Sequence, residues 1–216
     1  MTSTAVIEAI SRIAVVPVVV IDDAAHAGDL ARTLRDNGIA TAEVTLRTPA
    51  ALDAISAMGS IEGFLVGAGT VVSALDVAAA VDAGARFLVS PGLDEVCLQR
   101  AAERGIPFVP GVATATEVQR AHTAGLRYVK LFPAGVLGGR ALIDALSAPF
   151  PRMRFLPSGG VDANNLTDYL ASPAVFAVSG SWMVPRTAIA ARDLALVARR
   201  TAETARRVAS TASFEG

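Results

Sequence analysis

The chain has 216 residues and a mass of 22.1 kDa, and its 19 basic and 20 acidic side chains give a net charge of -1. This balance excludes a protein that binds nucleic acid through bulk positive charge, and 52% hydrophobic with only 18% charged residues excludes a disordered chain. The longest run without a polar residue, 13–21, is shorter than the roughly 20 residues of a membrane-spanning helix. Because there is one cysteine and no leader peptide, we expect a soluble, cytoplasmic protein.

Short apolar, β-branched runs alternate along the chain with longer stretches of helical period, a pattern typical of strand-helix units around a parallel sheet. Eight strands are predicted, over residues 14–21, 40–46, 64–69, 87–90, 107–110, 128–132, 154–157 and 175–179. Helices are predicted over residues 24–36, 49–58, 73–83, 95–104, 116–124, 139–147 and 164–170, with a polar C-terminal helix after residue 188. Gly38, Gly84, Gly105 and Gly125 stand where helices have to end.

Eight strands with intervening helices favour a (β/α)8 TIM barrel, with an additional N-terminal helix, over an open doubly wound sheet. A dinucleotide-binding sheet needs a Gly-x-Gly-x-x-Gly turn at its first helix. The first such turn, 20–24, has no glycine, and the segment 67–72 lacks the third one. No linker or low-complexity segment divides the chain, so we predict a single domain over residues 1–216.

Lys130 is the only lysine, since all other basic residues are arginine, and it lies inside an apolar strand-like run. An amine, unlike a guanidinium, can lose its proton and attack a carbonyl to form a Schiff base. A strand lysine can also be a simple surface residue whose stem packs on apolar neighbours. The avoidance of lysine everywhere else favours the catalytic interpretation.

Glu43 is the acidic residue within a predicted strand, and period-two geometry places Glu43, Thr45 and Arg47 on one face. In a barrel this face points into the mouth where active sites lie. An internal ion pair between Glu43 and Arg47 is the structural alternative. Together with Lys130, the carboxylate predicts an acid-base and covalent pair.

Two glycine-bearing segments, Pro-Ser-Gly-Gly-Val-Asp at 157–162 and Ser-Gly-Ser-Trp at 179–182, follow the seventh and eighth predicted strands. Loops at these places commonly bind phosphate in a barrel, because glycine lets backbone N–H groups approach an anion. Metal chemistry lacks support, since His26 and His122 lie far apart and Cys97 has no second cysteine. We expect Cys97 to be a core residue.

These residues resemble the class I aldolases of 2-keto-3-deoxy-6-phosphogluconate (KDPG), a family that often also has 4-hydroxy-2-oxoglutarate aldolase activity. The resemblance covers nearly the whole chain. It is carried by Val-Pro-Val at 16–18, Glu-Val-Thr-Leu-Arg-Thr at 43–48, Gly-Ala-Gly-Thr-Val at 67–71, Ser-Pro-Gly-Leu at 90–93, Pro-Gly-Val at 110–112, Val-Lys-Leu-Phe-Pro-Ala at 129–134, Pro-Ser-Gly-Gly-Val at 157–161 and Gly-Ser-Trp at 180–182.

The resemblance implies a (β/α)8 barrel, a homotrimer, and cleavage of KDPG to pyruvate and glyceraldehyde 3-phosphate without a metal or organic cofactor. It implies that Lys130 forms the imine and that Glu43 moves protons through water. The implied binding residues are Arg47 and Thr70 for the keto-acid carboxylate, Pro91 and Phe132 for the pyruvate pocket, and Gly159, Gly160 and Ser181 for the phosphate. Ser158 stands where the family more commonly has threonine and would face the substrate's C4 hydroxyl.

Three other functions stay open. A Schiff-base aldolase for the galacto epimer or for 4-hydroxy-2-oxoglutarate shares the core residues, although galactonate-type aldolases typically differ at Arg47 and Ser158, which favours the gluconate substrate. A non-covalent phosphate-binding barrel of isomerase or synthase type leaves Lys130 unexplained. The third is a non-catalytic sugar-phosphate-binding barrel, which would bind ligand without turnover. For the favoured function the expected partner is a small phosphorylated keto-acid substrate, and neither nucleic acid nor a membrane is expected as a partner.

Overall fold

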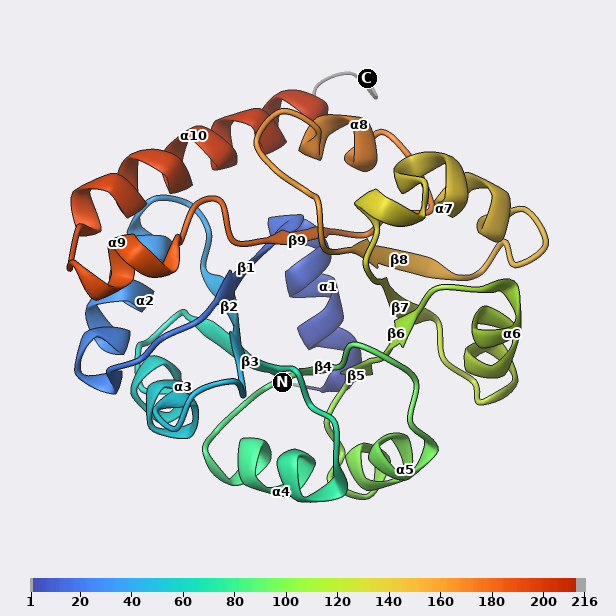
Figure 1. The fold of residues 1–216 in the computed structure, drawn as a ribbon, viewed down its shortest axis with the longest axis horizontal. Coiled ribbons are helices and arrows are strands. Elements are labelled where there is room, and N and C mark those ends of the chain that lie inside the picture. The colour runs from blue at the N-terminus through green and yellow to red at the C-terminus, as the bar shows by residue number, and fades with distance from the viewer. Residues whose placement is uncertain (1, 213–216) are drawn as a thin grey trace.

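The computed structural model describes residues 2–212, and its central layer consists of parallel strands (Figure 1). The strands are β1 Val15–Val19, β2 Thr41–Thr45, β3 Leu65–Gly69, β4 Leu88–Val89, β5 Phe108–Val109, β6 Gly111–Val112, β7 Tyr128–Leu131, β8 Arg154–Pro157 and β9 Val178–Gly180. Every strand pair is parallel. The predicted α/β class is therefore confirmed.

The strands form two sheets, one of six strands in the order β5-β4-β3-β2-β1-β9 and one of three in the order β6-β7-β8. Residues 2–212 contain nine strands where eight were predicted, because β6 follows the predicted strand 107–110 and is separated from β5 by Pro110. Proline has no N–H to contribute to a ladder. Between β8 and β9 only two isolated bridges form, Phe155 with Val175 and Ser158 with Ser179. The last predicted strand accordingly starts late, at Val178.

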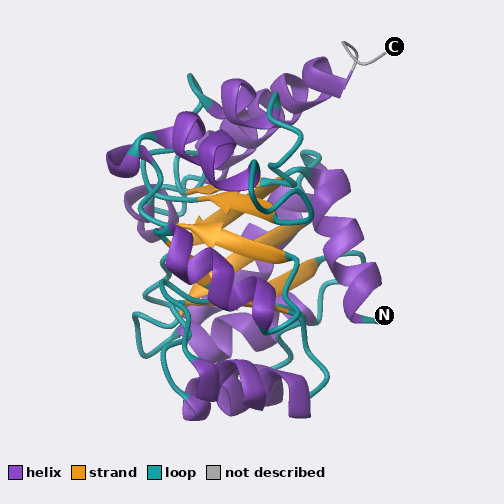
Figure 2. Cartoon of the chain, turned by 90° about the vertical axis from the view of Figure 1, so that its right-hand side faces the viewer, coloured by secondary structure: helices purple, strands orange, loops and turns teal. Residues whose placement is uncertain are grey.

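Helices surround the strands, as the side view in Figure 2 shows. They are α1 Ser3–Ile13, α2 Ala27–Asp36, α3 Ala51–Gly59, α4 Ala74–Asp82, α5 Glu95–Glu103, α6 Ala115–Thr123, α7 Gly139–Ser147, α8 Leu166–Leu170, α9 Arg186–Ala190 and α10 Leu194–Ala212, with 3-10 turns at Ala24–His26 and Gly135–Leu137. The predicted helix over 24–36 thus begins with a 3-10 turn. The C-terminal helical region is two helices, because Arg192 between them has a φ of +56°.

Glycine ends four of the helices where the sequence predicts it. Gly38, Gly84, Gly105 and Gly125 have φ values of +94°, +97°, +64° and +80°. This left-handed backbone is strained for side chains with a Cβ but not for glycine. These turns return the chain to the start of the next strand, so they set the strand-helix alternation that the sequence pattern indicates.

Two apolar clusters hold the layers together. The larger one fills the space between the strands and the outer helices, with Leu34, Ile55 and Val129 among its fully buried members. The smaller one lies inside the ring of strands, where Ile7 and Ile10 of α1 pack against inward-facing strand side chains. Figure 1 shows α1 crossing the middle of this ring. Helix α1 therefore covers the inner cluster.

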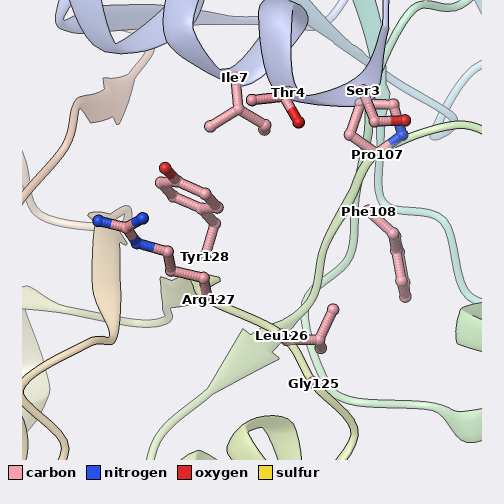
Figure 3. A pocket seen from close by; sticks show the side chains of 9 residues that line it. All are labelled: Ser3, Thr4, Ile7, Pro107, Phe108, Gly125, Leu126, Arg127 and Tyr128. Carbon is pink, nitrogen blue, oxygen red and sulfur yellow. The ribbon is translucent and has the colours of Figure 1, made fainter.

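A cavity of about 340 Å³ lies beneath α1, between Ser3, Thr4 and Ile7 and the segments that lead into β5 and β7 (Figure 3). Tyr128, the first residue of β7, lines it. It belongs to the amino ends of the strands, whereas the predicted site residues lie in the strands or follow their carboxyl ends. Across residues 2–212 no helix is long and apolar enough to cross a membrane.

Candidate active site

Lys130 and Glu43 meet inside the ring of strands although 87 positions separate them in the chain. Lys130 comes from β7 and Glu43 from β2, and the Lys130 Nζ lies 3.3 Å from the Glu43 Oε1. Only 6% of Lys130 and 1% of Glu43 are exposed to solvent. Buried charges need a partner, and each of these groups supplies one to the other.

The second oxygen of Glu43 has capacity left for a ligand. Oε2 is buried and accepts no hydrogen bond from any residue in the range 2–212. A buried carboxylate oxygen without a donor is unusual, and at a catalytic site it is explained by a water or substrate group. Glu43 therefore has one oxygen on the amine and one available for a second proton donor.

Gly69 leaves the room that the Glu43 carboxylate occupies. A Cβ on this glycine, the last residue of β3, would overlap the Glu43 side chain from Cγ to Oε1. In the pairing of β2 with β3, Glu43 lies opposite Gly67, so its side chain reaches diagonally along β3 to Gly69, two residues further on. The Glu43 carboxylate can therefore lie here only because residue 69 has no side chain.

We predict that Gly69→Ala displaces the Glu43 carboxylate and costs about 1–3 kcal/mol of stability through overpacking. Turnover should fall by more than the loss of folded protein explains, measured as kcat per folded molecule together with the thermal midpoint. Gly59→Ala is the matched control, because its nearest non-neighbouring atom, Val66 Cγ1, would lie at an ordinary 3.5 Å. An unchanged kcat in the Gly69 variant would contradict this prediction.

Phe132 forms an apolar wall beside the amine. The Lys130 Nζ lies 5.4 Å from the centre of the Phe132 ring, which is 38% exposed. The ring also lies close to the Gly159 backbone, where a Cβ would be 3.2 Å from its Cε2 atom. Phe132 therefore lies close both to the amine and to the loop that follows β8.

Arg47, Thr70 and Pro91 follow the carboxyl ends of three neighbouring strands, β2, β3 and β4. Arg47 is exposed, and its Nε donates to the Thr45 Oγ1 at 3.2 Å. It forms no ion pair with another described residue, so the alternative of a Glu43–Arg47 pair is wrong. Thr70 has a φ of +59°, a strained conformation for a β-branched residue that concentrates at functional sites.

The loop of Ser158, Gly159 and Gly160 follows β8, and Ser181 follows β9. Gly159 and Gly160 have φ values of +82° and +87°. Within the described part of the chain, the N–H groups of Gly160 and Ser181 have no hydrogen-bond acceptor. Backbone N–H groups with free hydrogen-bonding capacity in a glycine turn can bind an anion.

Ser179 begins the predicted segment 179–182, but sequence reasoning gave this residue no role of its own. Its hydroxyl is fully buried and donates to the Ser158 Oγ at 3.2 Å, so it orients that side chain. The available signal was a serine that follows the apolar run 174–178 of the last predicted strand. Burial makes such a hydroxyl seek a partner.

Cys97 lies in α5 and not in the site. It is fully buried, and burial, followed by the nearby Asp94 carboxylate, raises the pKa of its thiol to about 12. Because desolvation disfavours the thiolate, which is the reactive form, the thiol should stay protonated and unreactive below that pH. No group of three or more His, Cys, Asp or Glu side chains in residues 2–212 is arranged to hold a metal ion.

We predict that iodoacetamide near pH 9 does not alkylate Cys97 in the folded protein, although a free thiol with an ordinary pKa reacts there. Alkylation should become fast in denaturant, where the thiol is solvated. Intact-mass measurement of folded and unfolded samples checks this. Rapid stoichiometric labelling of the folded protein would mean that Cys97 is accessible.

Comparison with known proteins identifies the group to which this arrangement belongs. Residues 6–200 match the aldolase family described as KDPG and KHG aldolase. The chain belongs to this family. The family predicted from the sequence is thus confirmed.

Three relatives illustrate the match. The 2-dehydro-3-deoxy-phosphogluconate aldolase of Treponema pallidum is 44% identical over 193 residues, 89% of this chain and 92% of the relative. The KHG/KDPG aldolase of Escherichia coli is 42% identical over 180 residues, 83% and 84% of the two chains. A crystal structure of KDPG aldolase from Legionella pneumophila, with pyruvate captured as a covalent carbinolamine intermediate, has 36% identity and a TM-score of 0.88, covering 94% of this chain and 98% of that one.

Proposed function

We propose that this aldolase cleaves KDPG to pyruvate and glyceraldehyde 3-phosphate through a Schiff base on Lys130. The observation that carries the proposal is the contact between the chain's single lysine and a buried carboxylate with one unpaired oxygen. An amine held in an apolar, partly closed site next to a proton acceptor is the arrangement that covalent aldol chemistry requires.

The steps follow from these two side chains. The Lys130 amine attacks the C2 ketone, and loss of water leaves a protonated imine that can accept an electron pair. Glu43 takes the proton of the C4 hydroxyl, the C3–C4 bond breaks, and the aldehyde leaves while the pair moves into an enamine. The enamine takes a proton at C3, and water then hydrolyses the imine to release pyruvate and the free amine.

The other residues bind the two ends of the substrate. Arg47, whose guanidinium has no ion-pair partner among residues 2–212, and Thr70 hold the keto-acid carboxylate. Pro91 and Phe132 shape the pocket around the pyruvyl group, and Ser158 faces the C4 hydroxyl. At the far end, the phosphate is bound by Gly159, Gly160 and Ser181.

Strands β5 and β6 run on from one another across Pro110, and the bridges between β8 and β9 join the other edges of the two sheets. We infer one closed (β/α)8 barrel domain in a cytoplasmic homotrimer; of the predicted domain range 1–216, residue 1 and residues 213–216 lie outside the described residues. Light scattering tests the trimer, and a monomer mass would refute it.

Borohydride reduction in the presence of pyruvate tests the covalent step. Reduction should fix a pyruvyl adduct on Lys130, and because the chain has no other lysine, peptide mass spectrometry can assign it without ambiguity. Omitting either pyruvate or borohydride is the control. If the folded protein forms no adduct, the non-covalent phosphate-binding barrel is favoured over the Schiff-base aldolase.

A second substrate, 4-hydroxy-2-oxoglutarate (KHG), is favoured by the name of the Escherichia coli relative, KHG/KDPG aldolase. Comparing kcat/KM for KDPG, its galacto epimer and 4-hydroxy-2-oxoglutarate separates the alternatives. We expect KDPG to be preferred. A higher value for either competitor would assign that substrate instead.

A further inference from the structure

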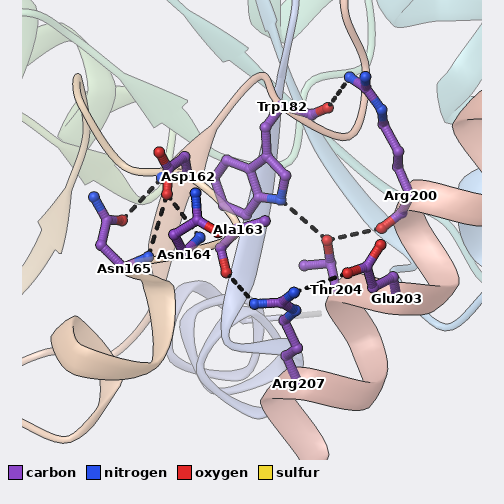
Figure 4. A network of polar contacts seen from close by, with 9 residues as sticks. All are labelled: Asp162, Ala163, Asn164, Asn165, Trp182, Arg200, Glu203, Thr204 and Arg207. Carbon is purple, nitrogen blue, oxygen red and sulfur yellow. Dashed lines mark hydrogen bonds and ion pairs between the residues drawn. The ribbon is translucent and has the colours of Figure 1, made fainter.

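Helix α10 makes hydrogen bonds to both of the glycine loops that follow β8 and β9. Figure 4 shows Arg200, Thr204 and Arg207 reaching from α10 toward these loops. The proposed mechanism uses no residue of α10, which lies beyond the whole site in sequence. A helix that contacts two loops of one binding site can set the distance between them.

The first connection runs through Trp182. Its Nε1 donates to the Thr204 Oγ1 at 3.1 Å, and the Arg200 Nη1 donates to its carbonyl at 2.8 Å. A Cβ on Gly180 would overlap the indole, so the ring lies directly against the backbone of this loop. Ser181, between these two residues, therefore takes its place from a ring that α10 holds.

The second connection runs through Arg207. Its Nη1 donates to the Ala163 carbonyl at 2.6 Å, and its Nη2 pairs with the Glu203 Oε1 at 2.9 Å. Ala163 lies two residues before Asn165, whose Nδ2 donates to the Gly160 carbonyl at 2.8 Å. Arg207 therefore holds the turn that orients the Gly160 peptide.

Both loops need this support because glycine does not hold its own conformation. Gly159 and Gly160 stand at positive φ, and glycine loses more conformational freedom on ordering than other residues. In addition, backbone N–H groups from two separate loops must point at one phosphate. If the loops were not ordered beforehand, ordering them on binding would weaken affinity for that group.

We propose that Arg207 and Thr204 of α10 are positioning residues that set the spacing of the two loops and thereby the affinity for the substrate's phosphate end. The inference rests on the proposed function, in which the phosphate binds between these loops. Neither residue touches the substrate. Their loss separates the phosphate-binding groups and leaves the Lys130 and Glu43 chemistry as it is.

The test compares Arg207→Met and Thr204→Val with wild type on KDPG and on unphosphorylated 2-keto-3-deoxygluconate. Arg206→Met on the same helix is the matched control, because Arg206 is exposed and makes no hydrogen bond or ion pair within residues 2–212. We expect KM for KDPG to rise about tenfold in each variant, as for loss of one hydrogen bond with a charged or buried group. The kcat for KDPG and both constants for the unphosphorylated acid should stay within about twofold.

Several outcomes would overturn the inference. Equal losses on the two substrates would mean that α10 supports the whole fold rather than the phosphate end. An unchanged KM for KDPG in both variants would mean that the loops keep their geometry without α10.

Arg207→Lys should restore part of the affinity, since an ammonium can still donate to the Ala163 carbonyl.

A failure of the proposed function is recognisable separately. If wild type neither cleaves KDPG nor forms a pyruvate adduct, the aldolase proposal fails. Binding of inorganic phosphate, measured by titration calorimetry, then tests the inference alone. Wild type should bind it more tightly than Arg207→Met, and equal affinities or absent binding would overturn the role of α10.

Discussion

Lys130→Arg should abolish turnover, lowering kcat by about 10⁴-fold or more, while the protein keeps its fold. Arginine retains the positive charge that the buried Glu43 needs, but its guanidinium does not lose a proton and cannot form an imine. Because Glu43 Oε2 is unpaired, the guanidinium can form a bidentate ion pair with both carboxylate oxygens. Cleavage is measured by coupling pyruvate release to a dehydrogenase.

Arginine is a better substitution here than alanine. Lys130→Ala would leave the Glu43 carboxylate, 1% exposed, without its cation, and breaking a buried pair in this way costs about 3–5 kcal/mol. Loss of activity would then be confused with unfolding. Circular dichroism and the thermal midpoint of Lys130→Arg give the necessary control.

Two results would contradict the role of Lys130. Retained cleavage in a pure Lys130→Arg sample would exclude the covalent mechanism. A borohydride-stable pyruvate adduct in the same variant would place the reactive amine elsewhere, and the N-terminal amine would be the remaining source.

Glu43→Gln should lower kcat by about 10²–10⁴-fold, the usual contribution of a general acid-base group. Glutamine has nearly the same shape and can still accept a hydrogen bond from the Lys130 Nζ, but it cannot take the proton of the C4 hydroxyl. The adduct with pyruvate should still form, only more slowly. Exchange of the pyruvate methyl protons for deuterium isolates the proton-transfer step and should fall by a similar factor.

Near-normal deuterium exchange in Glu43→Gln would remove Glu43 from the proton-transfer role. Arg47→Met is the comparison variant, because Arg47 is proposed to bind the carboxylate and not to move protons. It should raise KM for KDPG and for pyruvate exchange with a smaller effect on kcat. The contrast between the two variants separates chemistry from binding.

The strand-helix order could be predicted from the sequence because it depends on local features. The spacing of apolar residues, runs of β-branched residues and glycines at helix ends each depend on residues close together in the sequence. Gly84 and Gly125, for example, end helices where predicted. The departures are also local but subtler. The unpredicted strand β6 begins after Pro110, which has no N–H to donate, and Arg192 divides the C-terminal helical region at a positive φ.

The site was accessible from the sequence as a set of residue types but not as contacts. Lys130 is conspicuous because the chain otherwise uses arginine, and that one fact indicates amine chemistry in any fold. Its partner was less certain, since strand alternation allowed Glu43 to pair with Arg47 instead. The structure brings Glu43 to Lys130, and Arg47 keeps its guanidinium free of carboxylates among the described residues.

The sequence by itself therefore determined the α/β class and the family, and it supplied the proposed reacting groups as residue types, because periodicity, motifs and composition are written in neighbouring residues. Tertiary structure alone decided which groups meet. The 3.3 Å Lys130–Glu43 contact, the space left by Gly69 and the hold of Arg207 on Ala163 all join residues of different elements. Such contacts depend on strand order, register and helix packing, which no local pattern specifies.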